Sequence, residues 1–421
     1  MSCNWPLKRI SEVANFENNK RIPLKSLDRE KRQGIYPYYG ASGVVDYIDD
    51  FIFDGRYLLI SEDGENLRTR NTPIAFQASG KFWVNNHAHI LSEKEEGILD
   101  YLEYYFSVLN IGAYITGAVQ PKLNKANLDK IEIPIPPKGE RLKLNNVLNS
   151  LKYKVALNSE TSQTLEEMAQ AIFKSWFVDF DPVKAKMNGE QPEGMDAATA
   201  SLFPEKLVES ELGLIPEGWD INYIKDFGKV VTGKTPPKKV EDAYAEEGVP
   251  FVTPSDIDSD VFVSETKRFL SESGVEAVKK SLLPEGSICV TCIGSQMGKA
   301  VISPSEAVSN QQINSIVVSK DYVRNFLFLN LRRRREEIFL IGSSGSTMPI
   351  INKSTFEKLA VLTPSEELMR SFDRSVSSLL SKIHQNAIEN QTLSSLRETL
   401  LPKLLSGEIE LGQAQELAEV E

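Results

Sequence analysis

Two stretches decide the fold: residues 144–176 read LNNVLNSLKYKVALNSETSQTLEEMAQAIFKSW, and residues 372–404, 228 positions later, read FDRSVSSLLSKIHQNAIENQTLSSLRETLLPKL. In each stretch, mostly apolar residues recur at alternating steps of four and three, which is the heptad pattern of a coiled-coil helix. The sequence therefore predicts two long helices, each with one seam that packs against a partner helix.

The two seams share a polar centre. Asn158 and Ser162 interrupt the first seam, and Asn386 and Asn390 interrupt the second at the same places. A polar residue in such a seam lowers stability but fixes the register. Polar residues face polar residues in either direction, so the seam alone leaves the orientation open. We expect an antiparallel pair, with Asn158 opposite Asn390 and Ser162 opposite Asn386, because each helix follows its own globular domain. The seam residues expected at the contact are Leu148, Leu151, Val155, Asn158, Leu165, Val376, Leu379, Ile383, Asn386 and Leu393.

The rest of the chain also contains an internal repeat. Trp5 is echoed by Trp219 at an offset of 214, and Asn85-Asn86-His87 parallels Asn310-Gln311-Gln312 at an offset of 225. The offset reaches 228 before the helices and then stays constant. The two globular copies therefore differ in their interior lengths, whereas the two helices do not.

The 421 residues predict an α+β protein, with two mixed α/β globular domains separated by two long antiparallel coiled-coil helices. We expect strands near 57–60, 131–135, 287–293, 313–318 and 358–362, and helices near 99–109 and 321–339. The expected domains are 1–137 and 218–364, the coiled-coil helices 138–180 and 365–406, an acidic linker or docking segment 181–217, and an acidic tail 407–421.

The net charge of −11 is concentrated in two segments. Residues 189–217 hold seven acidic residues and one basic residue, and the tail beyond Leu404 holds five acidic residues and no basic one. The remainder is neutral on average, so the overall acidity neither excludes nor favours a DNA partner. No apolar run approaches 18 residues, and the first residues lack a signal-peptide core, so we expect a cytoplasmic protein.

Residues 228–235, GKVVTGKT, match the P-loop pattern of nucleotide-binding proteins. A P-loop needs a helix that opens at its Lys-Thr pair, but Pro236 and Pro237 follow directly and disfavour a helix. We interpret the match as accidental, and a P-loop protein built around Lys234 remains an alternative.

Cysteines and histidines suggest no metal site. Cys289 and Cys292 lie in a strand-like run, where residues three apart point to opposite faces, and a lone pair cannot complete a zinc site. His87 and His89 have no nearby cysteine or carboxylate pair in the sequence. An amino-methyltransferase centre would need an Asn/Asp-Pro-Pro-aromatic segment, which the sequence lacks. These features favour a binding protein over an enzyme, and a scaffold that binds only protein is a further alternative.

Three stretches resemble the specificity (S) subunits of type I restriction–modification systems. They are AIFKSWFVDFDPV at 171–183, LGLIPEGW at 212–219 and TLLPKLLSGEI at 399–409, and the repeat itself is a fourth point of likeness. The resemblance implies that the two globular domains are target-recognition domains of a non-catalytic subunit, which reads a bipartite, gapped DNA site. It also implies that the subunit docks methyltransferase subunits, expected to be two, together with restriction subunits. S-adenosylmethionine, ATP and Mg²⁺ would then belong to those partners, and this chain would hold no cofactor.

Candidate DNA-reading residues come from polar stretches that recur in both copies. Arg, Lys, Asn and Gln read base edges, and Lys, Arg, Ser and Thr hold phosphates. Arg332–Arg335 is a basic run in a predicted helix, for which phosphate contact and a solvated face stay open. The candidates are Arg68, Arg70, Asn71, Lys81, Trp83, Asn85, Asn86, His87, Gln120 and Lys122 in the first copy, and Ser295, Gln296, Lys299, Asn310, Gln311, Gln312, Ser343 and Ser346 in the second.

Overall fold

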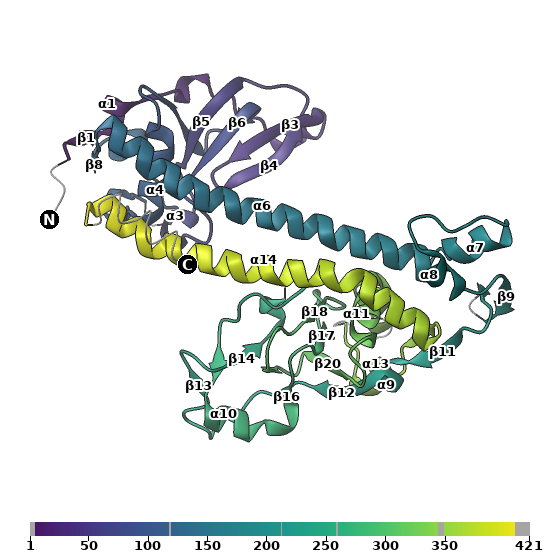
Figure 1. The fold of residues 1–421 in the computed structure, drawn as a ribbon. Coiled ribbons are helices and arrows are strands. Elements are labelled where there is room, and N and C mark those ends of the chain that lie inside the picture. The colour runs from purple at the N-terminus through teal and green to yellow at the C-terminus, as the bar shows by residue number, and fades with distance from the viewer. Residues whose placement is uncertain (1–4, 118, 212, 258–259, 344–348, 409–421) are drawn as a thin grey trace. The chain divides into compact units, whose positions relative to one another are not determined.

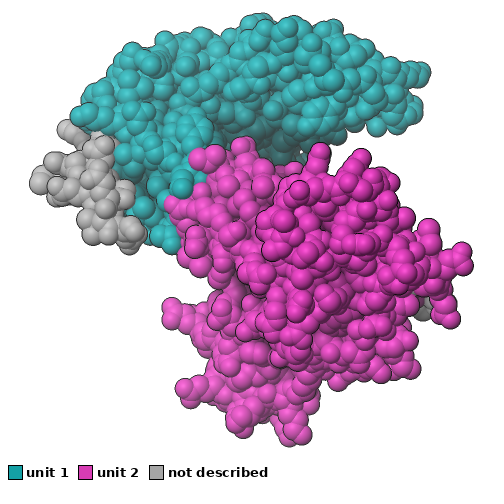
Figure 2. All heavy atoms as spheres, turned by 45° about the vertical axis from the view of Figure 1, so that its right-hand side comes forward, with its two compact units in different colours: residues 1–154, 392–421 teal, residues 155–391 magenta. Residues whose placement is uncertain are grey.

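A computed structural model describes residues 5–117, 119–211, 213–257, 260–343 and 349–408. The chain divides into two compact units (Figure 2). Unit 1 comprises Met1–Lys154 with Thr392–Glu421, and unit 2 comprises Val155–Gln391. Each unit therefore contains one globular copy and a part of both long helices.

The two long helices are α6, Lys138–Phe177, and α14, Glu366–Ser406 (Figure 1). Within unit 2, the Asn158 side-chain amide donates to Asn390 Oδ1 at 3.0 Å, and the Asn386 amide donates to Ser162 Oγ at 3.1 Å. These pairs confirm the antiparallel orientation and its expected register. The predicted seam residues Leu148, Leu151, Asn158, Val376, Ile383 and Asn386 are buried, and Val155, Leu165, Leu379 and Leu393 are half-buried.

Unit 1 is built on a six-stranded sheet in the order β2-β7-β5-β6-β3-β4. Alternation along the strands creates two apolar faces. Leu58 and Leu91 pack with helix α4 and with the unit 1 parts of α6 and α14, whereas Leu59 and Ile90 belong to a second cluster. The elements are β1 Leu7–Arg9, α1 Ile10–Val13, β2 Ala14–Phe16, α2 Ser26–Arg29, β3 Gln33–Gly40, β4 Gly43–Ile48, β5 Phe53–Ser61, α3 Asn66–Thr69, β6 Ala75–Val84, β7 Ala88–Glu93, α4 Ile98–Val108, α5 Lys125–Leu128 and β8 Glu132–Pro134.

Unit 2 carries a four-stranded sheet, β12-β20-β17-β18, and a five-stranded sheet, β13-β15-β14-β19-β16. Its strands are β9 Leu207–Ser210, β10 Gly213–Pro216, β11 Asp220–Tyr223, β12 Gly228–Thr232, β13 Tyr244–Ala245, β14 Val249–Val252, β15 Phe269–Leu270, β16 Leu282–Leu283, β17 Ile288–Thr291, β18 Ala300–Ile302, β19 Ala307–Ser309, β20 Ile313–Val318 and β21 Ala360–Thr363. Its short helices are α7 Asp181–Met187, α8 Ala197–Ser201, α9 Ile224–Phe227, α10 Glu272–Ala277, α11 Val323–Arg333, α12 Arg335–Ser343 and α13 Lys353–Glu357.

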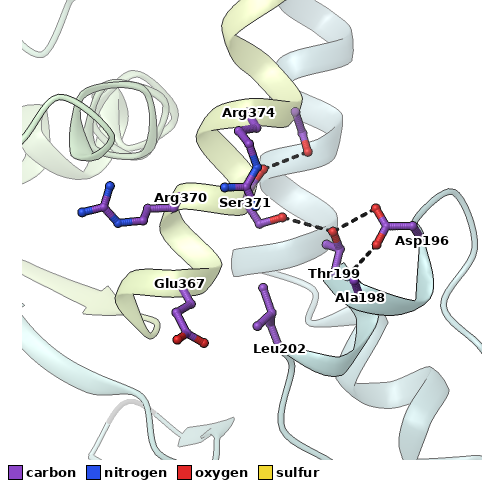
Figure 3. Close-up of a pocket in the computed structure, with 9 residues that line it drawn as sticks. Asp196, Ala198, Thr199, Leu202, Glu367, Arg370, Ser371 and Arg374 are labelled. Carbon is purple, nitrogen blue, oxygen red and sulfur yellow. Dashed lines mark hydrogen bonds between the residues drawn. The ribbon is translucent and has the colours of Figure 1, made fainter.

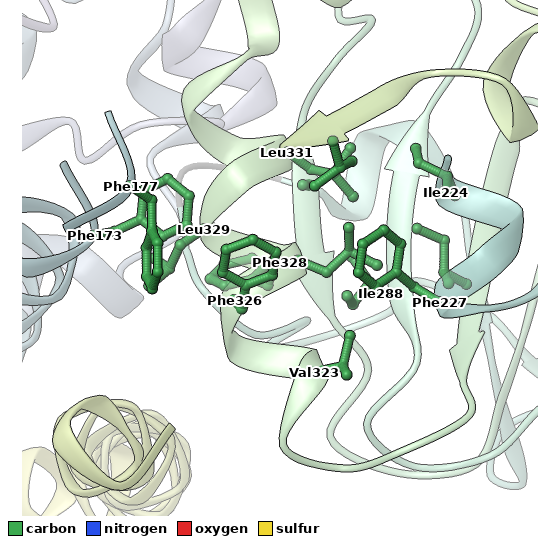
Figure 4. Close-up of a cluster of buried hydrophobic side chains, with 14 of the residues drawn as sticks. Phe173, Phe177, Ile224, Phe227, Ile288, Val323, Phe326, Phe328, Leu329 and Leu331 are labelled. Atoms are coloured by element: carbon green, nitrogen blue, oxygen red, sulfur yellow. The ribbon is translucent and has the colours of Figure 1, made fainter. Parts of the chain in front are cut away.

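An aromatic cluster joins helix α6 to the core of unit 2. Phe173 and Phe177 pack against Phe326 of α11, and Figure 4 shows these three rings. Both also pack against Phe372 of α14, and the ring centroids of these pairs are 4.9–5.9 Å apart. Buried aromatic rings contribute large apolar areas and prefer such tilted contacts. This part of α6 is thus anchored by side-chain packing as well as by its heptad seam.

Strand pairing confirms the repeat at the level of single residues. Leu7 pairs with Pro134 in the first copy, and Ile221 pairs with Leu362 in the second, which reproduces the offsets of 214 and 228. Helix α4 maps onto α11 at an offset of 225 without a shift at either end. The globular copies therefore share this strand pair and this helix at matched positions, although their larger sheets differ.

Two expectations need correction. The predicted helix at 321–339 is two helices, α11 and α12, because the backbone leaves helical geometry at Arg334. Segment 181–217, expected to be a linker or a docking segment, is not a linker. It forms α7, α8 and a β9–β10 hairpin, and its Val183 and Phe203 are buried in the unit 2 core. The apolar residues of this acidic segment are too few to form a helical or strand-like period. Its regular structure therefore becomes visible only in the packed fold.

Candidate nucleic-acid interface

Three stretches that the sequence singled out in the first copy lie side by side. The backbone N–H of Glu62 donates to the His87 carbonyl, and that of Leu123 donates to the Glu62 carbonyl, both at 2.8 Å. Gly64 N–H donates to the Pro121 carbonyl at 3.1 Å. These bonds join residues 62–70, 85–87, 116–117 and 119–123 into what we call the first loop cluster.

The second copy repeats this arrangement bond for bond. Cys292 N–H donates to the Gln312 carbonyl at 2.8 Å, and Ile351 N–H donates to the Cys292 carbonyl at 2.9 Å. Gly294 N–H donates to the Pro349 carbonyl at 2.9 Å, the counterpart of the Gly64 bond. The second loop cluster comprises residues 292–299, 310–312 and 349–351.

Local sequence explains why both clusters adopt the same backbone. Gly64 and Gly294 have φ angles of 108° and 87°, a region that favours glycine. Asn85 Oδ1 accepts from the backbone N–H of His87 at 2.8 Å, and Asn310 Oδ1 accepts from that of Gln312 at 3.0 Å. Each asparagine thus closes the same short turn with its own side chain.

Charged side chains line the first loop cluster. Arg21 donates to Glu62 at 2.7 Å and to the Asn86 carbonyl at 3.2 Å, and Lys122 Nζ lies 3.5 Å from Glu62. Burial opposes ionisation of Glu62, but the hydrogen bond from Arg21 and the surrounding positive groups outweigh it and lower the Glu62 pKa. His87 Nδ1 lies 2.9 Å from both carboxylate oxygens of Asp63.

Amide and hydroxyl groups take the matched positions in the second loop cluster. Thr235 donates its hydroxyl proton to Gln311 Oε1 at 2.7 Å, and the Asn310 amide donates to Gln312 Oε1 at 3.2 Å. Cys292 and Ile293 stand where the first cluster has Glu62 and Asp63. One backbone frame therefore carries two different sets of hydrogen-bonding groups.

A family model for the type I restriction modification DNA specificity domain matches residues 3–167 and 216–398. The chain belongs to this family. It is 31% identical over 396 residues to the HindI specificity subunit of Haemophilus influenzae, covering 85% of this chain and 84% of that protein. It is 25% identical over 430 residues to the MjaIX specificity subunit of Methanocaldococcus jannaschii, covering 96% and 94%. Family membership assigns the chain to the DNA sequence-specificity subunits of type I restriction–modification systems, and not to an enzyme class.

A solved structure shares the fold. The crystal structure of a type I restriction–modification system S subunit from M. genitalium superposes with a TM-score of 0.61 at 14% identity. The match covers 95% of this chain and 96% of that one. The two-copy architecture with long helices is therefore the fold of a solved S subunit.

In the structure of this S-family chain, several candidate DNA-reading residues are exposed, and others are engaged in internal contacts. Trp83 is only 4% exposed and donates to the Ile22 carbonyl at 2.6 Å, so it is a core residue. Arg70 donates to the carbonyls of Phe106 and Leu109 at the end of helix α4, which makes it a structural cap. Ser343 donates to the Phe339 carbonyl within α12, and Ser346 lies outside the described residues. The exposed candidates are Arg68, Asn71, Lys81, Asn86, His87, Gln120, Lys122, Ser295, Gln296 and Gln311, and Asn85, Lys299, Asn310 and Gln312 are half-buried.

Sequence reasoning missed three residues that complete the clusters. Arg21 and Thr235 stand at matched places and contact Asn86 and Gln311, respectively, while Asp63 holds His87. The signal for Arg21 was present, because the repeat aligns Lys20-Arg21 with Lys234-Thr235. The Asp63 contact joins residues 24 apart across two loops and had no such signal.

Two of the four arginines at 332–335 are engaged in internal contacts. Arg332 donates to Glu166 and to the Ala300 carbonyl, and Arg334 donates to Glu337 and to the Ala360 carbonyl. The remaining two arginines are exposed.

The P-loop match has another explanation in the structure. Residues 228–232 form strand β12, and no helix opens at Lys234. A Cβ atom at Gly233 would lie 2.0 Å from the Asn310 carbonyl oxygen, so this glycine permits the close approach of two backbones. Its role is to pack β12 against the second loop cluster.

Cys289 and Cys292 pack into two different apolar clusters, as expected for opposite faces. Burial raises the pKa of both thiols to about 11, which disfavours the thiolate form. Among the described residues, no group of three His, Cys, Asp or Glu side chains is arranged to hold a metal ion. Within the same part of the chain, no helix is long and apolar enough to cross a membrane.

A polar cavity of about 540 Å³ lies in unit 2 between helix α8 and the start of α14 (Figure 3). Asp196 caps α8 by accepting from Thr199 N–H at 2.7 Å, and the Thr199 hydroxyl lies 3.1 Å from Ser371 Oγ. Arg370 stacks on Tyr322 and pairs with Glu366. These contacts attach the segment after α7 to α14, and they form no nucleophile–base pair.

Proposed function

We propose that each globular copy reads one half of a bipartite, gapped DNA site through its loop cluster. The observation that carries this proposal is the pair of clusters, which share every framing hydrogen bond described above but differ in their side chains. A protein that reads two different half-sites needs one backbone frame that carries two sets of side chains. The sugar-phosphate geometry is the same in both half-sites, whereas the base edges differ.

Each cluster offers groups suited to base edges. In this proposal the imidazole of His87 and the side-chain amides of Gln311 and Gln312 hydrogen-bond to base edges in the major groove. Lys122 and Arg68 are exposed cations beside the first set, and in this proposal they contact phosphates. The net charge of −11 is no obstacle, since the acidic residues are concentrated in 189–217 and the tail.

We further propose that this chain docks two methyltransferase subunits, which hold S-adenosylmethionine, and restriction subunits, which use ATP and Mg²⁺. Helices α6 and α14 expose Leu157 by 58%, Met168 by 48% and Ile388 by 51%. Apolar side chains on the outer side of a paired helix are suited to burial by a partner protein. In this proposal the chain supplies recognition and assembly, and its partners supply the chemistry.

The test is co-expression of this chain with a methyltransferase subunit of a type I system, followed by sequencing of methylated adenines in host DNA. We expect a two-part motif with an unspecified spacer that requires this chain. Methylation that is ungapped, or unchanged without the chain, would refute the proposal. Assembly with the partner but no change in DNA recognition would point to a protein-only scaffold.

A further inference from the structure

Position 87 in the first loop cluster and position 312 in the second present hydrogen-bonding groups of opposite kind. The two residues hold matched places, since the backbone N–H of each donates to the side-chain oxygen of Asn85 or Asn310. The difference lies in the side-chain atom that remains for a ligand once the internal bonds are made.

His87 presents an acceptor. Its Nδ1 lies 2.9 Å from both oxygens of Asp63, and a carboxylate only accepts, so Nδ1 carries the proton. In the neutral ring, Nε2 therefore bears a lone pair. The His87 side chain is 48% exposed, and no other described residue bonds Nε2.

Gln312 presents a donor. Asn310 Oδ1 is committed to the backbone N–H of Gln312, so the Asn310 amide nitrogen must face the Gln312 side chain and donate to its Oε1. The Gln312 amino group then has no partner among the described residues, and the residue is half-exposed. A backbone N–H can only donate, and this fixes which atom of the Asn310 amide is the oxygen. The orientation of the Gln312 amide follows from it.

We infer that His87 and Gln312 are specificity-determining residues of opposite polarity, an inference that rests on the proposed function. In the major groove, adenine N6 and cytosine N4 are donors, whereas guanine O6 and N7 and thymine O4 are acceptors. His87 selects adenine or cytosine at one position of its half-site, and Gln312 selects guanine or thymine in the other half. Asp63 is a positioning residue, because it acts by fixing the tautomer of His87.

Two variants reverse these polarities with little change of shape. His87→Gln is made together with Asp63→Ile, because Ile293 stands at the matched place and no carboxylate then accepts from the new amide. Asn85 stands where Asn310 stands in the second copy, so the new amide adopts the donor arrangement of Gln312. In Gln312→Glu, one carboxylate oxygen still accepts from Asn310 and the other replaces the amino group with an acceptor. Each variant is co-expressed with the methyltransferase subunit, and the methylated adenines in host DNA are sequenced. The base frequencies at each position of the methylated motif are then compared with those of the wild type.

We expect the double variant with His87→Gln and Asp63→Ile to change the preference at one position from adenine or cytosine to guanine or thymine, by about tenfold in relative methylation. Gln312→Glu should make the opposite change at one position of the other half-site. Asp63→Ala should relax the position that the double variant reverses, because a freed imidazole uses either tautomer.

The outcomes separate the two levels of the proposal. A wild-type chain that yields no gapped motif contradicts the proposed function itself. A gapped motif that both variants leave unchanged, or that changes in both halves at once, overturns the assignment of His87 and Gln312. If the double variant abolishes methylation altogether, the isosteric Gln312→Glu decides between these outcomes.

Discussion

The two globular copies keep one backbone frame but continue their sheets differently. In the first copy, β6 runs without a break over Ala75–Val84 and joins all six strands into one sheet. At the matched positions the second copy has two short strands, β18 and β19, which belong to separate sheets. The break spares the hydrogen bonds that hold the loop clusters, so the surface proposed to read DNA is preserved while the sheet beneath it diverges.

The interiors beneath the loop clusters differ in charge. In the first copy the ion pair of Glu62 with Arg21 lies beside the fully buried His89. The second copy has Cys292 and Asn314 at the positions of Glu62 and His89. Backbone bonds define the frame in both, so side chains under it are free to differ. This freedom suits a domain whose specificity changes while its fold does not.

The two packed ends of the long helices differ in a similar way. In unit 1 the seam is lined by leucines, including Leu144, Leu401 and Leu404, whereas unit 2 has Phe372, Phe173 and Trp176 at the matched positions. Aromatic rings bury more area than leucines do. We therefore expect unit 2 to depend more strongly on its helix contact.

The largest expected effect is that of Phe173→Ala, which should lower the free energy of unfolding by about 4 kcal/mol. Phe173 is 1% exposed and contacts three other buried rings. The matched Leu401→Ala should cost about 3 kcal/mol. Chemical denaturation followed by tryptophan fluorescence measures both, and a larger loss for Leu401→Ala would reverse the comparison.

The next effect is a pH dependence that belongs to the first copy. Burial lowers the pKa of His89 below its ordinary value of 6.5, so the unfolded chain binds a proton first as the pH falls. The free energy of unfolding should therefore decrease below about pH 6.5, by at most about 1.4 kcal/mol per pH unit. His89→Asn introduces the residue of the second copy and should flatten this slope between pH 7.5 and 5.5. An unchanged slope in the variant would assign the pH dependence to another group.

A smaller effect distinguishes the two matched asparagines of the seam. Asn386 is 1% exposed, and its amide donates to Ser162, but its Oδ1 has no partner among the described residues. Because the cost of this unpaired oxygen exceeds the gain from the donated bond, Asn386→Leu should raise the free energy of unfolding by about 1 kcal/mol. Asn158 donates to both Glu389 and Asn390, so Asn158→Leu should lower it by about 1 kcal/mol. Thermal unfolding of both variants measures the two changes. Changes of the same sign would contradict the proposed difference between Asn386 and Asn158.

The smallest expected effect is none. Lys234→Ala should change neither stability nor methylation pattern, because Lys234 joins the β12 segment through its backbone N–H to Ser309. Equilibrium dialysis with ATP should detect no binding to the wild-type chain. Binding that the substitution abolishes would restore the P-loop hypothesis.

Much of the candidate site was visible as a repeat. Asn85 with Asn310 and His87 with Gln312 were found because polar residues recur at one offset. Trp83 was wrongly included since an aromatic residue beside polar ones looks alike whether it faces a ligand or the core. Arg70 was included for its charge, but its left-handed backbone, with φ of 52°, directs it to the end of α4.

The sequence by itself determined the duplication, the two long helices and the polar layer that sets their register. Heptad spacing and repeat offsets are local, periodic signals, so a single chain is enough to read them. Only the tertiary structure decided which loops meet, which polar atoms are spent on internal bonds, and which remain for a ligand. Those outcomes depend on hydrogen bonds between residues far apart in the chain, such as Asp63 with His87 and Thr235 with Gln311. Side-chain chemistry alone does not specify such partners, because the same carboxylate or amide is equally able to bond to water.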